Sequence, residues 1–111
     1  MNTPAHSERP RVEVTDHPAL NRFEARIHGE FAGYLDYNLI GDMMMFVHTI
    51  VQEAFKGQGV GGALARHALD VARSNGKGVV PVCSFIADHI RKHRDEYLDL
   101  VRPDIRQTFE I

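Results

Sequence analysis

Apolar and polar side chains alternate over residues 22–28. Phe23, Ala25 and Ile27 fall on one side of an extended chain, while charged side chains and a histidine fall on the other. A period of two residues places successive side chains on opposite faces of a strand. The segment therefore predicts a strand that buries one face and leaves the other in water.

The alternation resumes over residues 31–39, after a predicted hairpin turn at Gly29-Glu30. A second turn signal at Gly41-Asp42 leads into residues 43–51, which are mostly apolar on both sides. Because a strand covered on both faces reads as a nearly continuous apolar run, we expect this third strand to lie centrally with both faces buried.

A helical period follows a glycine-rich segment. Apolar residues recur there every three or four positions, at Val60, Leu64, Ala68, Val71 and Ala72. Gly76 is placed to end this helix as its C′ residue. A short strand over residues 77–83 and a helix capped by Ser84 come next. A last short helix over residues 95–105 is expected to end at Pro103.

The order of elements is three strands, a helix, a strand and a helix. This order predicts an α/β (α+β) fold with a mixed, mostly antiparallel sheet, helices packed on its faces and a final β-α-β crossover. A chain of 111 residues suffices for one compact domain. We expect residues 1–12 to form a flexible tail and residues 13–111 to form that domain.

Charge and composition narrow the classes of function. The net charge of −2 provides no basic surface for nucleic acid. The first ten residues lack the apolar segment of a secretory signal, and the longest apolar run, at 43–47, is too short for a membrane helix. The single cysteine, Cys83, excludes an internal disulfide and suits a reducing compartment. A cytoplasmic protein that works without nucleic acid or membrane is expected.

The glycine-rich segment at 55–62 reads FKGQGVGG. A Walker loop is excluded, because Ala63 rather than a Lys-Ser or Lys-Thr pair follows its last glycine. The dinucleotide pattern G-x-G-x-x-G is present, but residues 76–82 lack the acidic residue that normally binds the ribose. A coenzyme A loop also fits, because free amides at a helix N-terminus bind phosphates and glycines let them approach. A plain tight-packing turn is the remaining alternative.

Several segments together resemble the GNAT superfamily of acetyl-CoA-dependent N-acetyltransferases, and in particular its short single-domain branch. The segments are His48-Thr49, the KGQGVG loop at 56–61, VPVCSF at 80–85 and YLDL at 97–100. The resemblance extends over about residues 20 to 101. Two departures are Ile50, where the branch often has an acidic residue, and an apparent extra residue between His93 and Tyr97.

The resemblance implies a GNAT-like sheet and acetyl-CoA as cosubstrate, with no metal. Residues expected to bind acetyl-CoA lie at the end of the third strand and in the loop, namely Thr49, Ile50, Val51, Lys56, Gly57, Gln58, Gly59, Val60, Gly61 and Gly62. A backbone amide of the strand would hold the acetyl carbonyl, and the loop amides, aided by Lys56, would hold the diphosphate. A monomer or weak dimer is expected.

Four residues are candidates for catalysis: His48, Glu53, Cys83 and Tyr97. His48 has the chemistry of a general base near neutral pH, and Glu53 could act through a water molecule. The alternatives are a histidine satisfied by the backbone and a solvated acidic residue. In the GNAT-like fold, the last two strands of this order part to admit the pantetheine arm.

Cys83 ends one of these strands, so it could act as a nucleophile with His48 as partner, or simply fill space in the core. Tyr97 could protonate the leaving thiolate, as tyrosine does in many relatives, or could anchor the last helix. Cys83, His89 and His93 also suggest a metal site, but no fourth ligand is evident.

The leading hypothesis is an acetyl-CoA-dependent N-acetyltransferase whose acceptor is a small amine or an exposed protein or peptide amine. A hairpin turn replaces the helices that larger relatives insert between their first strands, so an open acceptor face is expected. The alternatives are a non-catalytic acyl-CoA-binding module or partner subunit, and a nucleotide-binding oxidoreductase.

Overall fold

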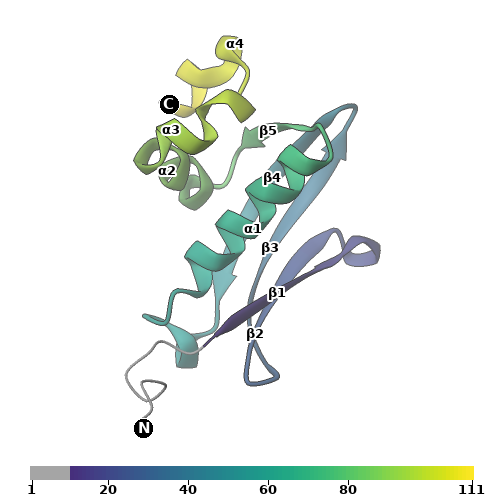
Figure 1. Ribbon diagram of the computed structural model, residues 1–111, viewed down its shortest axis with the longest axis vertical. Coiled ribbons are helices and arrows are strands. Elements are labelled where there is room, and N and C mark those ends of the chain that lie inside the picture. Colours follow the sequence, from purple (N-terminus) through teal and green to yellow (C-terminus); the bar gives the residue numbers. More distant parts are fainter. Residues whose placement is uncertain (1–10) are drawn as a thin grey trace, which may run out of the picture.

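The computed structural model describes residues 11–111, which form one sheet with helices (Figure 1). The strands are β1 (Val12–His17), β2 (Arg22–Ile27), β3 (Glu30–Ile40), β4 (Met43–Val51) and β5 (Gly78–Pro81). The helices are α1 (Val60–Ser74), α2 (Ser84–Lys92), α3 (Arg94–Tyr97) and α4 (Pro103–Arg106). Short 3-10 turns lie at Pro18–Leu20, Glu53–Phe55, Leu98–Leu100 and Gln107–Phe109.

The strand order in the sheet follows the order in the chain, β1-β2-β3-β4-β5. The first four strands pair antiparallel, and β5 pairs parallel to β4 after the crossover through α1. The predicted mixed, mostly antiparallel sheet and its β-α-β unit are thus confirmed. The strand β1 was not predicted, because its only inward apolar side chains are Val12 and Val14. It begins at Val12, inside the segment expected to be a tail.

β4 is an inner strand that pairs with both β3 and β5, but the expectation that both of its faces are covered is wrong. Met44 and Phe46 are buried on the side of α1, whereas Met43 and Met45 remain half-exposed on the other side. β4 lies next to the edge strand, and its second face carries no helix of the described chain. The continuous apolar run therefore reflects an uncovered apolar face rather than burial.

The core lies between α1 and the sheet. α1 lies along the sheet in Figure 1 and contacts all five strands. Its buried side chains are Val60, Leu64, Ala65, Ala68, Leu69 and Ala72. They pack on Phe23, Leu35 and Phe46, which are fully buried. The small alanines let the helix approach closely, and each large buried side chain contributes about 1.5–3 kcal/mol.

Turns and helix ends follow local chemistry. The hairpin between β2 and β3 turns at His28-Gly29, one residue earlier than predicted, with both residues at positive φ. Gly76 has φ 67° and follows α1 as predicted. Its amide donates to the Arg73 carbonyl and the Lys77 amide donates to Ala72, which together form a Schellman motif.

The C-terminal region differs from its prediction. The expected helix over 95–105 is divided into α3, a 3-10 turn and α4, and Pro103 begins α4 instead of ending a helix. Proline fits the first turn of a helix, where its missing N–H costs nothing. The cap residue of α2 is Cys83, and Ser84 is the first helical residue.

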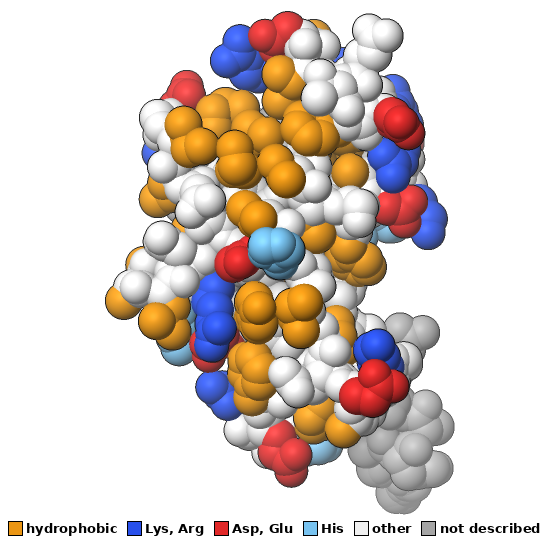
Figure 2. Space-filling view, turned by 180° about the vertical axis from the view of Figure 1, so that it is seen from behind, with side chains coloured by type: hydrophobic (Ala, Val, Ile, Leu, Met, Phe, Trp, Pro, Cys, Tyr) orange, Lys and Arg blue, Asp and Glu red, His pale blue; other side chains and the backbone are white. Residues whose placement is uncertain are grey.

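One face of the sheet is open. Figure 2 shows this rear face, where apolar side chains gather in groups separated by charged side chains and histidine. Only α1 and α2 make substantial helix contacts with the strands of the described chain, and α1 and α2 contact each other. Within residues 11–111, no helix has the length and apolar character needed to cross a membrane.

Candidate functional site

The strands β4 and β5 part halfway along β4. Their pairing ends at Phe46 and Pro81, and a last bond runs from the Cys83 amide to the Phe46 carbonyl at 2.8 Å. β4 continues to Val51 while still paired with β3. Residues 47–51 therefore leave one strand edge open toward a cleft.

The cleft has a volume of about 460 Å³. Its lining residues come from the free end of β4 and the start of α2, and they are Val47, His48, Thr49, Ile50, Val82, Cys83, Ser84 and Phe85. The first turn of α1 lies beside it, since the ring of Phe85 contacts Gly61. The structure thus brings the predicted strand end, Cys83 and the glycine loop to one region.

A β-bulge in β4 decides which backbone groups face the cleft. The register with β3 shifts between His48 and Phe46, so Val47 is the extra residue. Phe46 directs its carbonyl toward β5, whereas Gln52 donates to Ala32 on β3. Because alternate residues address opposite sides, Thr49 and Val51 present their amides and carbonyls to the cleft.

The bulge also orients His48. Asp36 on β3 accepts a hydrogen bond from the His48 amide at 2.6 Å, and its second oxygen lies 3.3 Å from Nδ1 of the imidazole ring. One carboxylate therefore satisfies the irregular backbone and fixes the ring, leaving Nε2 directed away from it. The His48 side chain is 66% exposed, so this nitrogen is open to the solvent on the rear face.

Asp36 was missed by the sequence analysis. Only the antiparallel register that pairs Asp36 with His48 reveals its role, and that register depends on the bulge. A polar residue within the strand pattern of residues 31–39 was the sole signal in the sequence.

The side chain of Cys83 contacts Thr49 and not His48, the partner that the sequence analysis considered. Its Sγ lies 3.2 Å from Oγ1 of Thr49, and the residue is only 7% exposed. His48 points to Asp36 instead, so the two side chains are not brought together as a nucleophile and its base. The pair Thr49-Cys83 instead places a hydroxyl and a thiol at the closed end of the cleft.

The glycine loop adopts the conformation that its composition requires. Gly59, the N-cap residue of α1, has φ 81°, which is a left-handed backbone that disfavours side chains. The Ala63 amide is the first to bond within the helix, to the Gly59 carbonyl. The amides of Val60, Gly61 and Gly62 precede it and have no partner within the helix.

Gly61 lies directly against the ring of Phe85. A Cβ at this position would lie 2.9 Å from the tip of the Phe85 ring, which is too close for an undisturbed contact. Phe85 therefore lies across the beginning of α1 while also lining the cleft. Gly62, by contrast, faces open space, so nothing in the fold demands a glycine there.

Lys56 and Glu53 form an exposed ion pair beside the loop. Lys56 Nζ lies 3.1 Å from Glu53 Oε1, and the Glu53 side chain is 90% exposed. Glu53 does not line the cleft between β4 and β5. Its position supports a surface role in balancing the charge of Lys56 rather than contact with reacting atoms.

Tyr97 lies outside the cleft. It is the last residue of α3, it is buried, and its ring lies 5.7 Å from that of His89 on α2. Burial, and then the charges of Asp70 and Glu96, raise the pKa of Tyr97. A buried phenol with a raised pKa is a poor proton donor to a distant thiolate.

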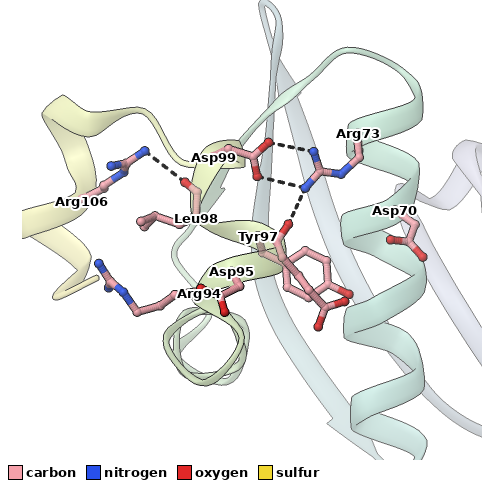
Figure 3. A pocket seen from close by; sticks show the side chains of 9 residues that line it. Asp70, Arg73, Arg94, Asp95, Tyr97, Leu98, Asp99 and Arg106 are labelled. Atoms are coloured by element: carbon pink, nitrogen blue, oxygen red, sulfur yellow. Dashed lines mark hydrogen bonds and ion pairs between the residues drawn. The ribbon is translucent and has the colours of Figure 1, made fainter.

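A second, more open cleft of about 520 Å³ surrounds Tyr97 (Figure 3). Arg73 spans it from α1, bonding both carboxylate oxygens of Asp99 at 2.8 and 3.0 Å and the Glu96 carbonyl at 2.5 Å. Arg106 donates to the carbonyls of Leu98 and Val101. These arginines hold the C-terminal turns against α1. The residues around this cleft therefore have a structural role in packing the C-terminal region.

The metal hypothesis gains no support from the geometry. Cys83 faces Thr49, while the rings of His89 and His93 contact each other at a tilt, with centroids 4.4 Å apart. Over residues 11–111, His, Cys, Asp and Glu side chains do not gather in threes in a way that could hold a metal ion.

Comparisons with known proteins agree with this geometry. The family model for GCN5-related N-acetyltransferases matches residues 22–100. A solution structure of a GCN5-like candidate N-acetyltransferase from Staphylococcus aureus is 26% identical, with a TM-score of 0.60, and the match covers 81% of this chain and 87% of that one.

A crystal structure of Ard1 from Thermoplasma volcanium is 21% identical with a TM-score of 0.47. The match covers 51% of this chain and only 39% of the Ard1 chain. The family match extends from the first residue of β2 to Leu100, and it includes the parted strands and the glycine loop. The chain belongs to the GCN5-related N-acetyltransferase family.

Proposed function

We propose that this protein transfers an acetyl group from acetyl-CoA to an amine. The parting of β4 and β5 beside the first turn of α1 is the observation that carries the proposal. It offers three features side by side: a helix end suited to anions, a strand edge with unpaired backbone groups, and a cleft. A thioester on a long arm that ends in a diphosphate needs all three.

The diphosphate would bind at the beginning of α1. The amides of Val60, Gly61 and Gly62 and the positive end of the helix dipole favour an anion there. Gly59 holds the left-handed cap that directs these amides outward. Lys56 would add a charge once it leaves Glu53, its exposed partner.

The arm of the coenzyme would enter the cleft along the free edge of β4. The amides of Thr49 and Val51 are the donors available to the acetyl carbonyl, whose oxygen gains negative charge when an amine attacks. The Thr49 hydroxyl and the Cys83 thiol lie at the closed end, where they can donate hydrogen bonds to the departing thiolate.

His48 would act as the general base. The acceptor amine, deprotonated by Nε2 of His48, attacks the thioester carbon, and the C–S bond breaks as the amide forms. The thiolate takes a proton from solvent, and His48 releases its own proton to solvent. Asp36 is a positioning residue, because it fixes the ring through Nδ1 and stabilises the charged imidazolium.

Binding and transfer test the proposal separately. A thermal shift with acetyl-CoA should exceed that with NAD or ATP, since ligand at 100 times its dissociation constant stabilises by about 2.7 kcal/mol. His48→Gln should then lower kcat about 100-fold while leaving this shift intact. Asp36→Asn should lower kcat about tenfold, and Asp16→Asn, a carboxylate change on the other side of the sheet, should not.

The same measurements identify the alternative. A protein that binds acetyl-CoA but neither hydrolyses it nor acetylates any amine is an acyl-CoA-binding module or a partner subunit. A thermal shift with NAD and none with acetyl-CoA would instead favour a nucleotide-binding oxidoreductase. The single cysteine fits a reducing cytoplasm, where we propose that the protein works as a monomer or weak dimer.

A further inference from the structure

The rear face of the sheet carries an apolar surface on both sides of His48. Alternation directs Tyr34, Ile40, Met45 and Ile50 to this face. Together with Val82, which follows β5 and lines the cleft with Ile50, they form what we call the open face. Figure 2 shows apolar groups gathered over this side of the molecule. Ile40, Ile50 and Val82 are 53%, 42% and 47% exposed. Ile40 pairs with Met43 and Ile50 pairs with Tyr34, so exposed apolar side chains lie on either side of the His48–Asp36 pair. Exposed apolar surface next to a reaction site marks an interaction surface.

The open face is continuous with the reaction site. Ile50 and Val82 line both the open face and the cleft in which the strands part. His48 projects between them and the apolar side chains nearer the Gly41 turn. An amine that reaches Nε2 of His48 from this side therefore has apolar side chains around it.

The acidic side chains of this face near His48 are already paired. Glu24 is buried and accepts bonds from Arg22 at 2.8 Å and Arg26 at 3.2 Å, with His17 3.4 Å away. Asp36 is bound to His48. Of the described acidic residues on β2, β3 and β4, none near His48 is left to attract a second positive charge.

A small polyamine would find no suitable site here. Its additional ammonium groups need unpaired carboxylates, whereas the arginines on β2 would repel them. An acceptor with a single amine and apolar groups beside it fits this face better. It brings only that amine to His48 and buries apolar surface on either side of it.

We propose that the acceptor amine belongs to a polypeptide whose apolar side chains, next to that amine, pack on the open face. This inference rests on the proposed function and specifies its acceptor. No helix of residues 11–111 covers this surface, so a peptide or an exposed protein segment fits it better than a molecule that needs a closed pocket.

Three acceptors test the inference with the full chain. The first is a short peptide whose free N-terminal amine and one lysine are flanked by leucine and valine. The second has acidic residues at the flanking positions, and the third is spermidine. Release of CoA thiol should give kcat/KM at least about tenfold higher for the apolar peptide than for either of the others, as burial of one aliphatic side chain allows.

Two neighbouring residues on β3 provide a matched pair of variants. Ile40 lies on the open face, and Leu39, which is 57% exposed, lies on the opposite side beside Tyr37 and Met44. Ile40→Glu should lower kcat/KM for the apolar peptide about tenfold, and Leu39→Glu should leave it unchanged. Met45→Gln is a milder second change on the open face with the same expected direction. Acetyl-CoA thermal shifts and hydrolysis should stay constant in all three.

Equal or faster acetylation of spermidine would overturn the inference, as would equal losses in the Ile40 and Leu39 variants. In both cases acetyl-CoA binding and transfer would still support the proposed function. If the unaltered protein gave no thermal shift with acetyl-CoA, the proposed function and this inference would both fail.

Discussion

Phe85 at the beginning of α2 lies against Gly61 in the first turn of α1, and a Cβ on residue 61 would come within 2.9 Å of its ring. The contact joins two helices at the place where the strands part. This contact explains the glycine at position 61 by packing. The other explanation for a glycine in this loop is the close approach of a ligand. The two explanations lead to different experiments.

A double-mutant cycle isolates this contact. Alanine is better than glycine inside a helix by up to about 1 kcal/mol, so Gly61→Ala should stabilise the fold when Phe85 has been replaced by alanine. With Phe85 present, the added methyl displaces the ring and the gain should disappear. Urea unfolding of the four proteins measures the coupling, and strictly additive free energies would show that the ring yields without cost.

Cys83 should prove dispensable for the chemical step. Its thiol is buried and bound to Thr49, and no described base contacts it, so Cys83→Ala should keep kcat within about tenfold of the original. Mass spectrometry after incubation with acetyl-CoA should find no acetylated Cys83. A stable acetyl adduct, or a loss as large as that of His48→Gln, would instead establish a covalent route.

Arg73 should contribute to stability and not to binding. Arg73→Ala removes the bonds to Asp99 and Glu96, which are exposed and charge-assisted, and should lower the free energy of unfolding by about 1 kcal/mol. Arg94→Ala, which removes an exposed arginine from the same cleft, is the matched control. An equal loss in both variants would contradict the role assigned to the Arg73 bonds.

Acid should weaken the ion pair between Arg73 and Asp99. The hydrogen bond from Arg73 holds the pKa of Asp99 below its ordinary value. A lowered pKa in the folded state gives stability that is present above the unfolded pKa and is lost as pH falls through the folded value. The difference in stability between the original protein and Arg73→Ala should therefore shrink as the pH falls below about 4.

His89 should make the fold sensitive to mild acid. Burial, and then the charges of His93 and Arg66, lower the pKa of His89, while Glu96 and Asp88 oppose the shift. The unfolded chain then binds a proton more readily, so stability should fall as pH drops from about 7 through the unfolded pKa near 6.5.

His89→Gln should flatten this decline in the free energy of unfolding. His28→Asn is the control, because His28 lies in the exposed β2–β3 turn at φ 51°, which asparagine tolerates. A decline of unchanged slope in His89→Gln would assign the acid sensitivity to other groups.

Much of the fold could be predicted from local patterns. The alternation around Phe23 and the helical period from Val60 located the strands and α1, because both depend only on neighbouring residues. β1 was missed, since a strand with two inward apolar residues gives little signal and owes its existence to pairing with β2. Pro103 was read as a stop because sequence alone does not reveal that the chain turns at Val101 to begin another helix.

The sequence provided candidate residues for the site but did not reveal how their side chains are arranged. The glycine pattern and the segment ending in Cys83 pointed to elements that border the cleft between β4 and β5. What each side chain contacts depends on the bulge at Val47, which changes the alternation of β4 by one residue and pairs His48 with Asp36. Such a shift has no signature in the sequence, so the partners of His48 and Cys83 could not be deduced.

The succession of strands in chain order has a consequence for biosynthesis. Every antiparallel pair joins segments that leave the ribosome one after the other, so the meander from β1 to β4 can assemble early, with short loops to close. The apolar face of this meander, which includes Phe23 and Phe46, then stays exposed until α1 leaves the ribosome. During that interval the nascent chain should be most vulnerable to aggregation and most dependent on chaperones.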